Sequence, residues 1–267
     1  MRRALPLALL ALLLLAGTAQ ASSYQVTGTT LTVTPAADQS VTLRAAPGGT
    51  YVIVASDSTW SGTGSYVSAS GANLTVGAAI TGVHVNDDLG TASAVVTGTG
   101  TGAPVAWDDH LTVQMTHAGS GVILTDDVGQ TAPIDFGTND VSLSAPNVTV
   151  AQTIAHAGMV VLTNTTRPVR ISEDITAGLI VVPGDPGVIV NPGTIRTLTA
   201  TTVSITGPVV GGTGCAGVGP ACRGAVGGNP QLLVIDGNLQ AQGAWSGLGQ
   251  LQVTGTARLG ADVSSGP

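Results

Sequence analysis

Paired aspartates are the residues in this sequence whose spacing most clearly suggests chemistry. Carboxylate oxygens suit calcium, which takes 6–8 such ligands, and paired carboxylates carry out acid–base work on sugars. The same residues also start turns between strands, and no D-x-D-x-D-G loop or nonapeptide G-G-x-G-x-D repeat accompanies them. We therefore interpret them first as turn residues. The alternative calcium ligands are Asp87, Asp88, Asp108, Asp109, Asp126 and Asp127.

The four histidines, His84, His110, His117 and His156, invite a search for a Ser-His-Asp triad. A hydrolase of that type would carry a nucleophile elbow, G-x-S-x-G, or a comparable local context, and the serines here lack it. We expect His84 to point outward from a strand, and His110 and His117 to lie in turns. The glycine-rich segments are followed by neither lysine nor helix-forming sequence, so they lack the form of phosphate loops. The sequence thus predicts no catalytic residue and no cofactor-binding residue.

The only two cysteines, Cys215 and Cys222, lie in one glycine-rich stretch. An even count at short spacing in an exported chain predicts a disulfide. It would close the loop 215–222 without holding the whole fold. The rival, a metal site, would need four ligands for structural zinc, and no histidine lies nearby.

The N-terminus has the form of a signal peptide. Met1-Arg2-Arg3 precedes an apolar run from Ala4 to Ala16, and an A-x-A-like site ends at Ala21. The run is shorter than the roughly 20 residues that a membrane span needs. We expect cleavage between Ala21 and Ser22 and a secreted or cell-surface product, with no membrane span in the mature form.

Composition and charge argue against two classes of protein, nucleic-acid-binding proteins and disordered proteins. The formal charge is −7, lysine is absent, and the six arginines beyond the predicted cleavage site do not cluster. Nucleic-acid binding needs a basic stripe that displaces counterions from phosphates, so no nucleic-acid partner is expected. Charged residues make up only 9% of a chain that is 43% hydrophobic. Disorder usually combines high charge with low hydrophobicity, so this chain should fold.

Short apolar–Ser/Thr–apolar tripeptides recur along the chain, as in Leu31-Thr32-Val33, Leu111-Thr112-Val113 and Val203-Ser204-Ile205. Alternation with period two, built from β-branched residues, is typical of half-buried strands. Aromatic residues are only 3% of the chain, which favours narrow stacked turns over a sandwich core. We predict an all-β chain: a parallel β-helix (β-solenoid) over 111–267, and an N-terminal β region over 22–110. A Thr/Gly-rich β-sandwich is the alternative, above all for the N-terminal region.

Short apolar–polar alternations follow one another in Asn139–Ile154 and Leu198–Pro208, and they continue in Leu232–Leu239 and Leu251–Leu259. In these runs, residues 139–262 resemble bacterial surface exoproteins of the filamentous-haemagglutinin type. It implies a right-handed parallel β-helix that is secreted or displayed, often for adhesion. The chain departs from that family in its length and in lacking a recognisable secretion or anchoring domain.

Three functions follow as hypotheses. The first is a non-enzymatic, adhesin-like structural protein. The second is an extracellular β-sandwich module that binds a glycan or a protein, for which an exposed Trp60, Trp107 or Trp245 would argue. The third is a polysaccharide lyase or hydrolase on a β-helix, for which carboxylates converging in a groove would argue. The open end of a β-helix exposes unpaired strand edges, so self-association through the ends is also expected.

Overall fold

The computed structural model describes residues 21–46, 50–57, 59–126, 131–183, 188–190, 195–206, 209–211, 232–241, 245–246 and 251–260. The described residues form strands and turns without a helix, which confirms the predicted all-β class. Accordingly, this part of the chain holds no helix that is long and apolar enough to cross a membrane.

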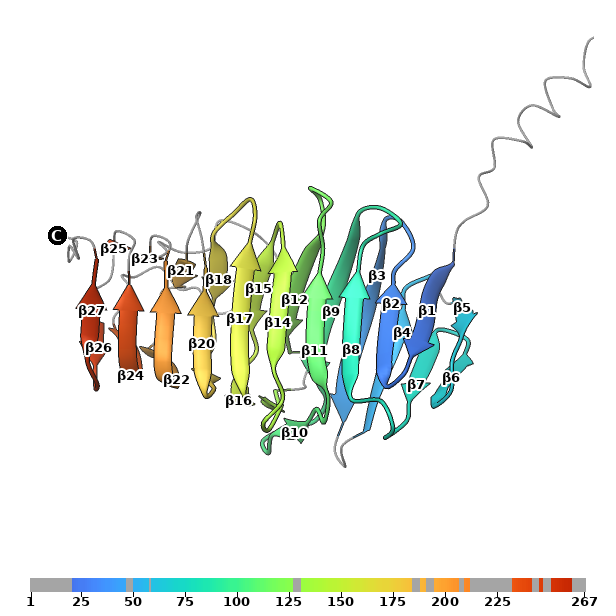
Figure 1. The fold of residues 1–267 in the computed structure, drawn as a ribbon, viewed down its shortest axis with the longest axis horizontal. Coiled ribbons are helices and arrows are strands. Elements are labelled where there is room, and N and C mark those ends of the chain that lie inside the picture. Colours follow the sequence, from blue (N-terminus) through green and yellow to red (C-terminus); the bar gives the residue numbers. More distant parts are fainter. Residues whose placement is uncertain are drawn as a thin grey trace, which may run out of the picture.

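The strands form two sheets that face each other, with strands stacked side by side along the long axis of the molecule (Figure 1). The larger sheet contains β1 (Ser22–Thr27), β2 (Thr30–Thr34), β5 (Trp60–Thr63), β8 (Gly82–Asn86), β10 (Val105–Ala106), β11 (His110–Gln114), β13 (Ile134–Asp135), β14 (Val141–Ala145), β16 (Ile154–His156), β17 (Met159–Asn164), β19 (Ile175–Thr176), β20 (Leu179–Val182), β22 (Ile195–Ile205), β24 (Leu232–Ala241), β26 (Leu251–Val253) and β27 (Ala257–Leu259).

The smaller sheet contains β3 (Gln39–Ala46), β4 (Thr50–Ala55), β6 (Val67–Ser70), β7 (Asn73–Val76), β9 (Ala92–Gly98), β12 (Gly121–Thr125), β15 (Val148–Ala151), β18 (Val169–Ile171), β21 (Val188–Val190), β23 (Val209–Gly211) and β25 (Trp245–Ser246). From β8 onward the chain passes repeatedly between the two sheets. The described strands in this part pair in parallel. In the smaller sheet the pairs join β9, β12, β15 and β18 in chain order, and in the larger sheet one series joins β8, β11, β14, β17 and β20 and another joins β10, β13, β16 and β19.

The strand registers align inward-facing apolar residues into columns that run through the molecule. Because successive side chains of a strand point to opposite faces, the apolar residues point inside. Along such a column, the residues that pair from strand to strand are all apolar and buried. One column of the larger sheet consists of Leu31, Val83, Leu111, Val141, Val160, Ile180, Val203 and Leu239, all buried. A second consists of Ile134, Ile154, Ile175, Leu198 and Ile235, also buried. The smaller sheet adds Leu43, Val96, Leu124, Val150 and Ile171.

Two successive layers share a local sequence repeat. Residues 154–162 read IAHAGMVVL and residues 175–182 read ITAGLIVV. The glycine in each marks a corner where neighbouring backbones touch. A Cβ on Gly178 would lie 2.6 Å from the carbonyl oxygen of Gly158, and a Cβ on Gly158 would lie 2.4 Å from that of Thr138. Only glycine fits such a close approach.

Antiparallel strands cover the N-terminal end of the stack. β1 reverses on β2, β4 reverses on β3, and β7 pairs antiparallel with both β4 and β6. The two regions expected on either side of residue 110 share both sheets, because β8 and β11 pair in parallel across that position. Their buried apolar residues form one continuous core.

The opposite end of the stack presents apolar side chains to solvent. β26 and β27 pair with β24 and, among the described strands, with no further one. Ala257 continues the column of Leu239 but is exposed, and Leu259 is 47% exposed. The two ends of the described fold therefore differ: the antiparallel pairs lie at one end, whereas only parallel pairs reach the other.

Candidate functional site

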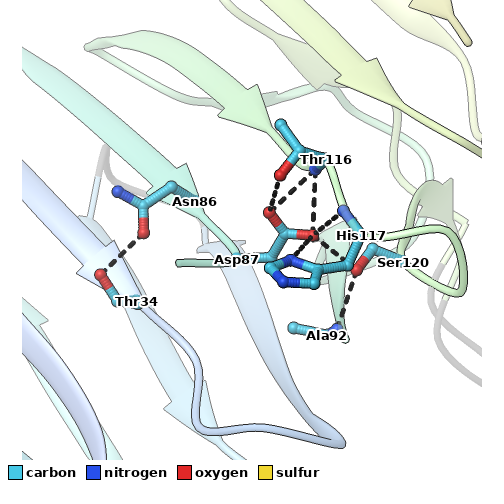
Figure 2. A network of polar contacts seen from close by, with 7 residues as sticks. All are labelled: Thr34, Asn86, Asp87, Ala92, Thr116, His117 and Ser120. Atoms are coloured by element: carbon cyan, nitrogen blue, oxygen red, sulfur yellow. Dashed lines mark hydrogen bonds and ion pairs between the residues drawn. The ribbon is translucent and has the colours of Figure 1, made fainter. Parts of the chain in front are cut away.

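The most densely bonded carboxylate of the described residues is Asp87, in the turn that follows β8 (Figure 2). Its side chain is 1% exposed. It accepts hydrogen bonds from the backbone N–H groups of Thr116 (2.8 Å) and His117 (2.8 Å). It also accepts bonds from the hydroxyls of Thr116 (3.2 Å) and Ser120 (2.6 Å). This carboxylate thus fastens the turn after β11 to the turn after β8.

The hydrogen-bond donors around Asp87 stabilise the ionised form of its carboxyl group. Burial alone would raise the pKa of this carboxyl, but the hydrogen bonds from Ser120, His117 and Thr116 outweigh burial and leave the pKa below its ordinary value. Hydrogen bonds to the charged form of an acid favour that form. Asp87 is therefore a buried, ionised acceptor whose oxygens are occupied by the protein's own donors.

Asp87, His117 and Ser120 are the residue types of a hydrolase triad, but their arrangement is different. In a triad the serine hydroxyl donates to the imidazole, and the carboxylate orients the opposite ring nitrogen. Here the single hydroxyl proton of Ser120 goes to Asp87, and the same oxygen accepts the backbone N–H of Ala92 at 3.0 Å. Ser120 is also wholly buried. The serine oxygen is therefore committed to structure and is not activated as a nucleophile.

The imidazole of His117 lies beside Asp87, with Nδ1 3.2 Å from Oδ2, and two other histidines also lie beside aspartates of neighbouring strands. His110 Nδ1 accepts the backbone N–H of Asp140 at 2.9 Å. His156 Nδ1 lies 3.4 Å from the carboxylate of Asp135. Both imidazoles are more than half exposed, so these contacts tie adjacent layers at the surface. His84 lies between the buried Val83 and Val85, which places it on the outward face as expected.

A second polar contact lies inside the molecule, between Tyr51 and Asp109. The phenol of Tyr51 donates to Asp109 Oδ2, and both residues are buried. Burial raises the pKa of Asp109, and the neighbouring Asp108 raises it further, although the bond from Tyr51 acts in the opposite direction. Burial and the bond to Asp109 raise the pKa of Tyr51 far above its usual range. The pair joins β4 to the start of β11.

Three aromatic residues that are far apart in sequence gather around this pair. Tyr51 stacks on Trp107 with ring centroids 4.2 Å apart, and Trp107 lies 6.2 Å from Phe136. Trp107 is 0% exposed, so it offers no face to a sugar. Trp60 is partly buried and donates its indole N–H to the carbonyl of Ala72 at 2.7 Å. The side chain of Trp245 lies outside the described residues.

The five predicted calcium ligands that the structure describes do not gather at one site. Asp87 and Asp109 are enclosed by different partners, as above, whereas Asp88, Asp108 and Asp126 are exposed. Asp127 lies outside the described residues, as do Cys215, Cys222 and residues 1–20. Within the described ranges no three side chains of His, Cys, Asp or Glu gather in a way that could hold a metal ion.

Sequence analysis missed several buried polar residues that connect layers. Gln152 is 2% exposed, accepts the N–H of Gly98 at 3.0 Å and donates to the carbonyl of Ala132 at 2.7 Å. The Tyr51–Asp109 contact spans 58 positions. No local pattern marks such contacts, because their partners depend on the length of each intervening layer.

Comparison with known proteins gives this chain no relatives: no protein-family model, no curated protein and no solved structure matches it.

Proposed function

We propose that this chain is an exported, non-enzymatic structural protein of the cell surface or extracellular space, adhesin-like in role, whose strands wind as a right-handed parallel β-helix. The observation that carries the proposal is the set of inward columns, in which each position repeats from one layer to the next. In a β-helix each turn contacts only its neighbours, so equivalent positions recur in every layer.

The connections support winding rather than a sandwich of hairpins. Parallel strands need a crossover between them, and here the crossover from one strand of the larger sheet to the next contains a strand of the smaller sheet. β22 pairs with β19 at Leu198 and with β20 at Val203, so a single strand turns a corner between two faces. Small-angle X-ray scattering should give a rod-like profile, whereas a globular profile would contradict the β-helix.

The outward face of the larger sheet carries polar side chains on β2, β8, β11 and β14. Thr32, His84, Thr112 and Ser142 stand in register across four strands and are partly exposed. The carboxylates and the serine examined above bond to the protein's own groups, which supports a display surface over a reaction cleft.

Export is supported by where the first strand lies. β1 begins at Ser22, directly after the predicted cleavage site at Ala21. Expression of the full chain followed by fractionation and N-terminal sequencing tests this part of the proposal. The expected product lies outside the cytoplasm and begins at Ser22, and a cytoplasmic chain that retains Met1 would contradict export.

Adhesion is tested with beads that carry the processed chain. They should adhere to immobilised extracellular-matrix proteins or cell surfaces more than beads carrying an unrelated exported protein. The same preparation is incubated with a panel of polysaccharides. Release of reducing ends or unsaturated sugars would contradict a non-enzymatic role.

A second candidate, glycan binding, is favoured by one depression of about 240 Å³ near the C-terminal end of the larger sheet. It is lined by Thr202, Asn238, Leu239, Gln240, Thr256 and Arg258. These side chains supply hydrogen-bond donors and acceptors on a shallow surface. On a glycan array, R258A should lose any signal that arises here, whereas R167A, which removes another exposed arginine, should retain it.

A further inference from the structure

The backbone nitrogen of Ser22 is held by a carboxylate. Ser22 opens β1 and is 0% exposed, although chain segments near a terminus are usually exposed. Its N–H donates to Asp57 Oδ2 at 2.7 Å, and its hydroxyl donates to the same oxygen at 3.1 Å. The hydroxyl oxygen also accepts the N–H of Ala36 at 3.1 Å.

Asp57 is positioned to serve as this acceptor. It lies in the turn between β4 and β5, and β5 pairs in parallel with β1, with Ser22 opposite Trp60. Its second oxygen, Oδ1, is 3.4 Å from the N–H of Thr59. The carboxylate therefore joins the first residue of β1 to the turn that leads into its neighbouring strand.

The nitrogen bound by Asp57 belongs to the peptide bond at which the sequence predicts cleavage. Hydrolysis by a signal peptidase would consume one water and break the C–N bond between Ala21 and Ser22. Ala21 would keep the carbonyl carbon as a carboxylate, and the nitrogen of Ser22 would take up protons to become an ammonium group. Signal peptidases act during export, before the chain folds, so the burial of Ser22 does not oppose the reaction.

We propose that Asp57 binds the α-ammonium group of Ser22 in the processed chain, forming an ion pair that exists only after the leader has been removed. The inference rests on the proposed export of the chain. In the unprocessed chain the same carboxylate accepts a neutral amide N–H, whereas in the processed chain both partners would be charged, which adds Coulombic attraction to the hydrogen bond. Processing thereby strengthens the contact that anchors β1 in the antiparallel N-terminal end of the stack.

Because the sequence contains no lysine, the α-amine of Ser22 can be modified selectively. After cleavage, the α-amine of Ser22 is the only primary amine in the chain, because no lysine occurs anywhere in the sequence. An acetylating ester therefore modifies this nitrogen and no other amine. The acetyl group restores a carbonyl where Ala21 had one and keeps an N–H, so it removes the charge with little change in shape.

The experiment compares four samples of the processed chain: free or acetylated amine, each with Asp57 or with Asp57→Asn. Acetylation is carried out in denaturant and followed by refolding, and mock-treated chains serve as controls. We expect acetylation to increase the unfolding equilibrium constant about tenfold with Asp57 and little with Asp57→Asn. Equal effects of acetylation in both backgrounds would overturn the ion pair.

A second measurement needs no variant. The amine of the folded, unsubstituted chain should react with the ester at least about tenfold more slowly than the amine of the chain in denaturant, because burial and ion pairing protect it. Equal rates would overturn the inference even where Asp57→Asn fails to fold.

N-terminal sequencing separates the proposed export from the proposed ion pair. A cytoplasmic chain that retains Met1 removes the basis of both, whereas an exported chain that begins at another residue, or that begins at Ser22 with an unprotected amine, overturns the ion pair alone.

Discussion

The hydroxyl of Ser120 donates to the carboxylate of Asp87 at 2.6 Å, across 33 positions of sequence. This bond uses the only proton that the serine could have offered to His117. Residue types typical of a hydrolase thus meet here in a different arrangement, in which the carboxylate joins two turns. The contact makes Asp87 the residue whose removal should most affect these turns.

Asp87→Asn should lower the free energy of unfolding by about 3 kcal/mol, because it removes a charged acceptor and leaves buried donors without a partner. Urea denaturation of the processed chain measures the change. Asp88→Asn is the matched control, since Asp88 is adjacent and exposed, and it should change stability by no more than about 0.5 kcal/mol. Equal effects of the two substitutions would contradict the role given to Asp87.

Acid should weaken the same contact. Burial opposes ionisation of Asp87, but its hydrogen bonds hold the pKa below the ordinary value. A carboxyl whose pKa is lower in the folded than in the unfolded state contributes stability above the unfolded pKa, near 3.9, and loses it as the pH falls through the folded pKa. Unfolding measured between pH 6 and pH 2 should show a smaller loss in Asp87→Asn than in the unsubstituted chain. An unchanged slope would argue against the contact.

Tyr51→Phe should destabilise the fold by about 2 kcal/mol at neutral pH, because Asp109 would remain buried without its phenol donor. Burial raises the pKa of Asp109, so protonation favours the folded state. The defect should therefore shrink as the pH falls through the folded pKa of Asp109. Thermal unfolding at several pH values gives the comparison. Tyr66→Phe, at a tyrosine that is 60% exposed, should have no such effect.

Gly178→Ala should be poorly tolerated because its Cβ would lie 2.6 Å from the carbonyl oxygen of Gly158. A backbone atom cannot move aside as a flexible side chain can, so the corner between the layers must shift. We expect a loss of about 2 kcal/mol, in the range typical of overpacking. Gly82→Ala is the control, since its nearest neighbours lie 3.9 Å away. Similar chemical denaturation curves for the two variants would disprove the close stacking.

Leu259→Glu should reduce association of the processed chain through its C-terminal end. Leu259 is 47% exposed at an edge strand, and exposed edges and apolar groups favour pairing with another chain. Light scattering over a range of concentrations should show oligomers of the unsubstituted chain and fewer of the variant. Tyr66→Asn alters another large hydrophobic residue that is exposed in the described part of the chain, and it should leave association unchanged. A strictly monomeric unsubstituted chain would refute self-association.

Strand positions were the part of the fold most open to prediction. Leu31-Thr32-Val33 and Leu111-Thr112-Val113 lie in strands whose apolar residues are buried. A strand that is buried on one face has apolar residues at every second position, so its sequence shows the alternation. The rule fails at Val148-Thr149-Val150, where Thr149 is also buried. Period two states which residues share a face, and it does not state what covers the opposite face.

The internal polar and aromatic contacts were not open to prediction. Trp107 and Phe136 look isolated along the sequence, yet they meet because the register of β10 and β13 aligns Ala106 with Asp135, the residues directly before them. From one layer to the next, aligned residues are 52, 28, 30, 19 and 20 positions apart between Leu31 and Ile180. Irregular layer lengths conceal the repeat, and any contact between layers depends on lengths that local patterns do not encode.

The unequal ends of the stack give the chain a direction in which to fold. The proposed export would deliver the N-terminus first, so folding would begin at that end, as it does in domains that fold during synthesis. The antiparallel pairs β1–β2, β3–β4 and β6–β7 can form hairpins from neighbouring residues, so they provide an early template. Each later segment then needs to find only one partner, the last edge already in place. Most ladder contacts after β8 are made between adjacent layers, which keeps the search short for each added strand. A truncated chain would therefore end as a shorter stack with the same N-terminal end, and growth would proceed in one direction only.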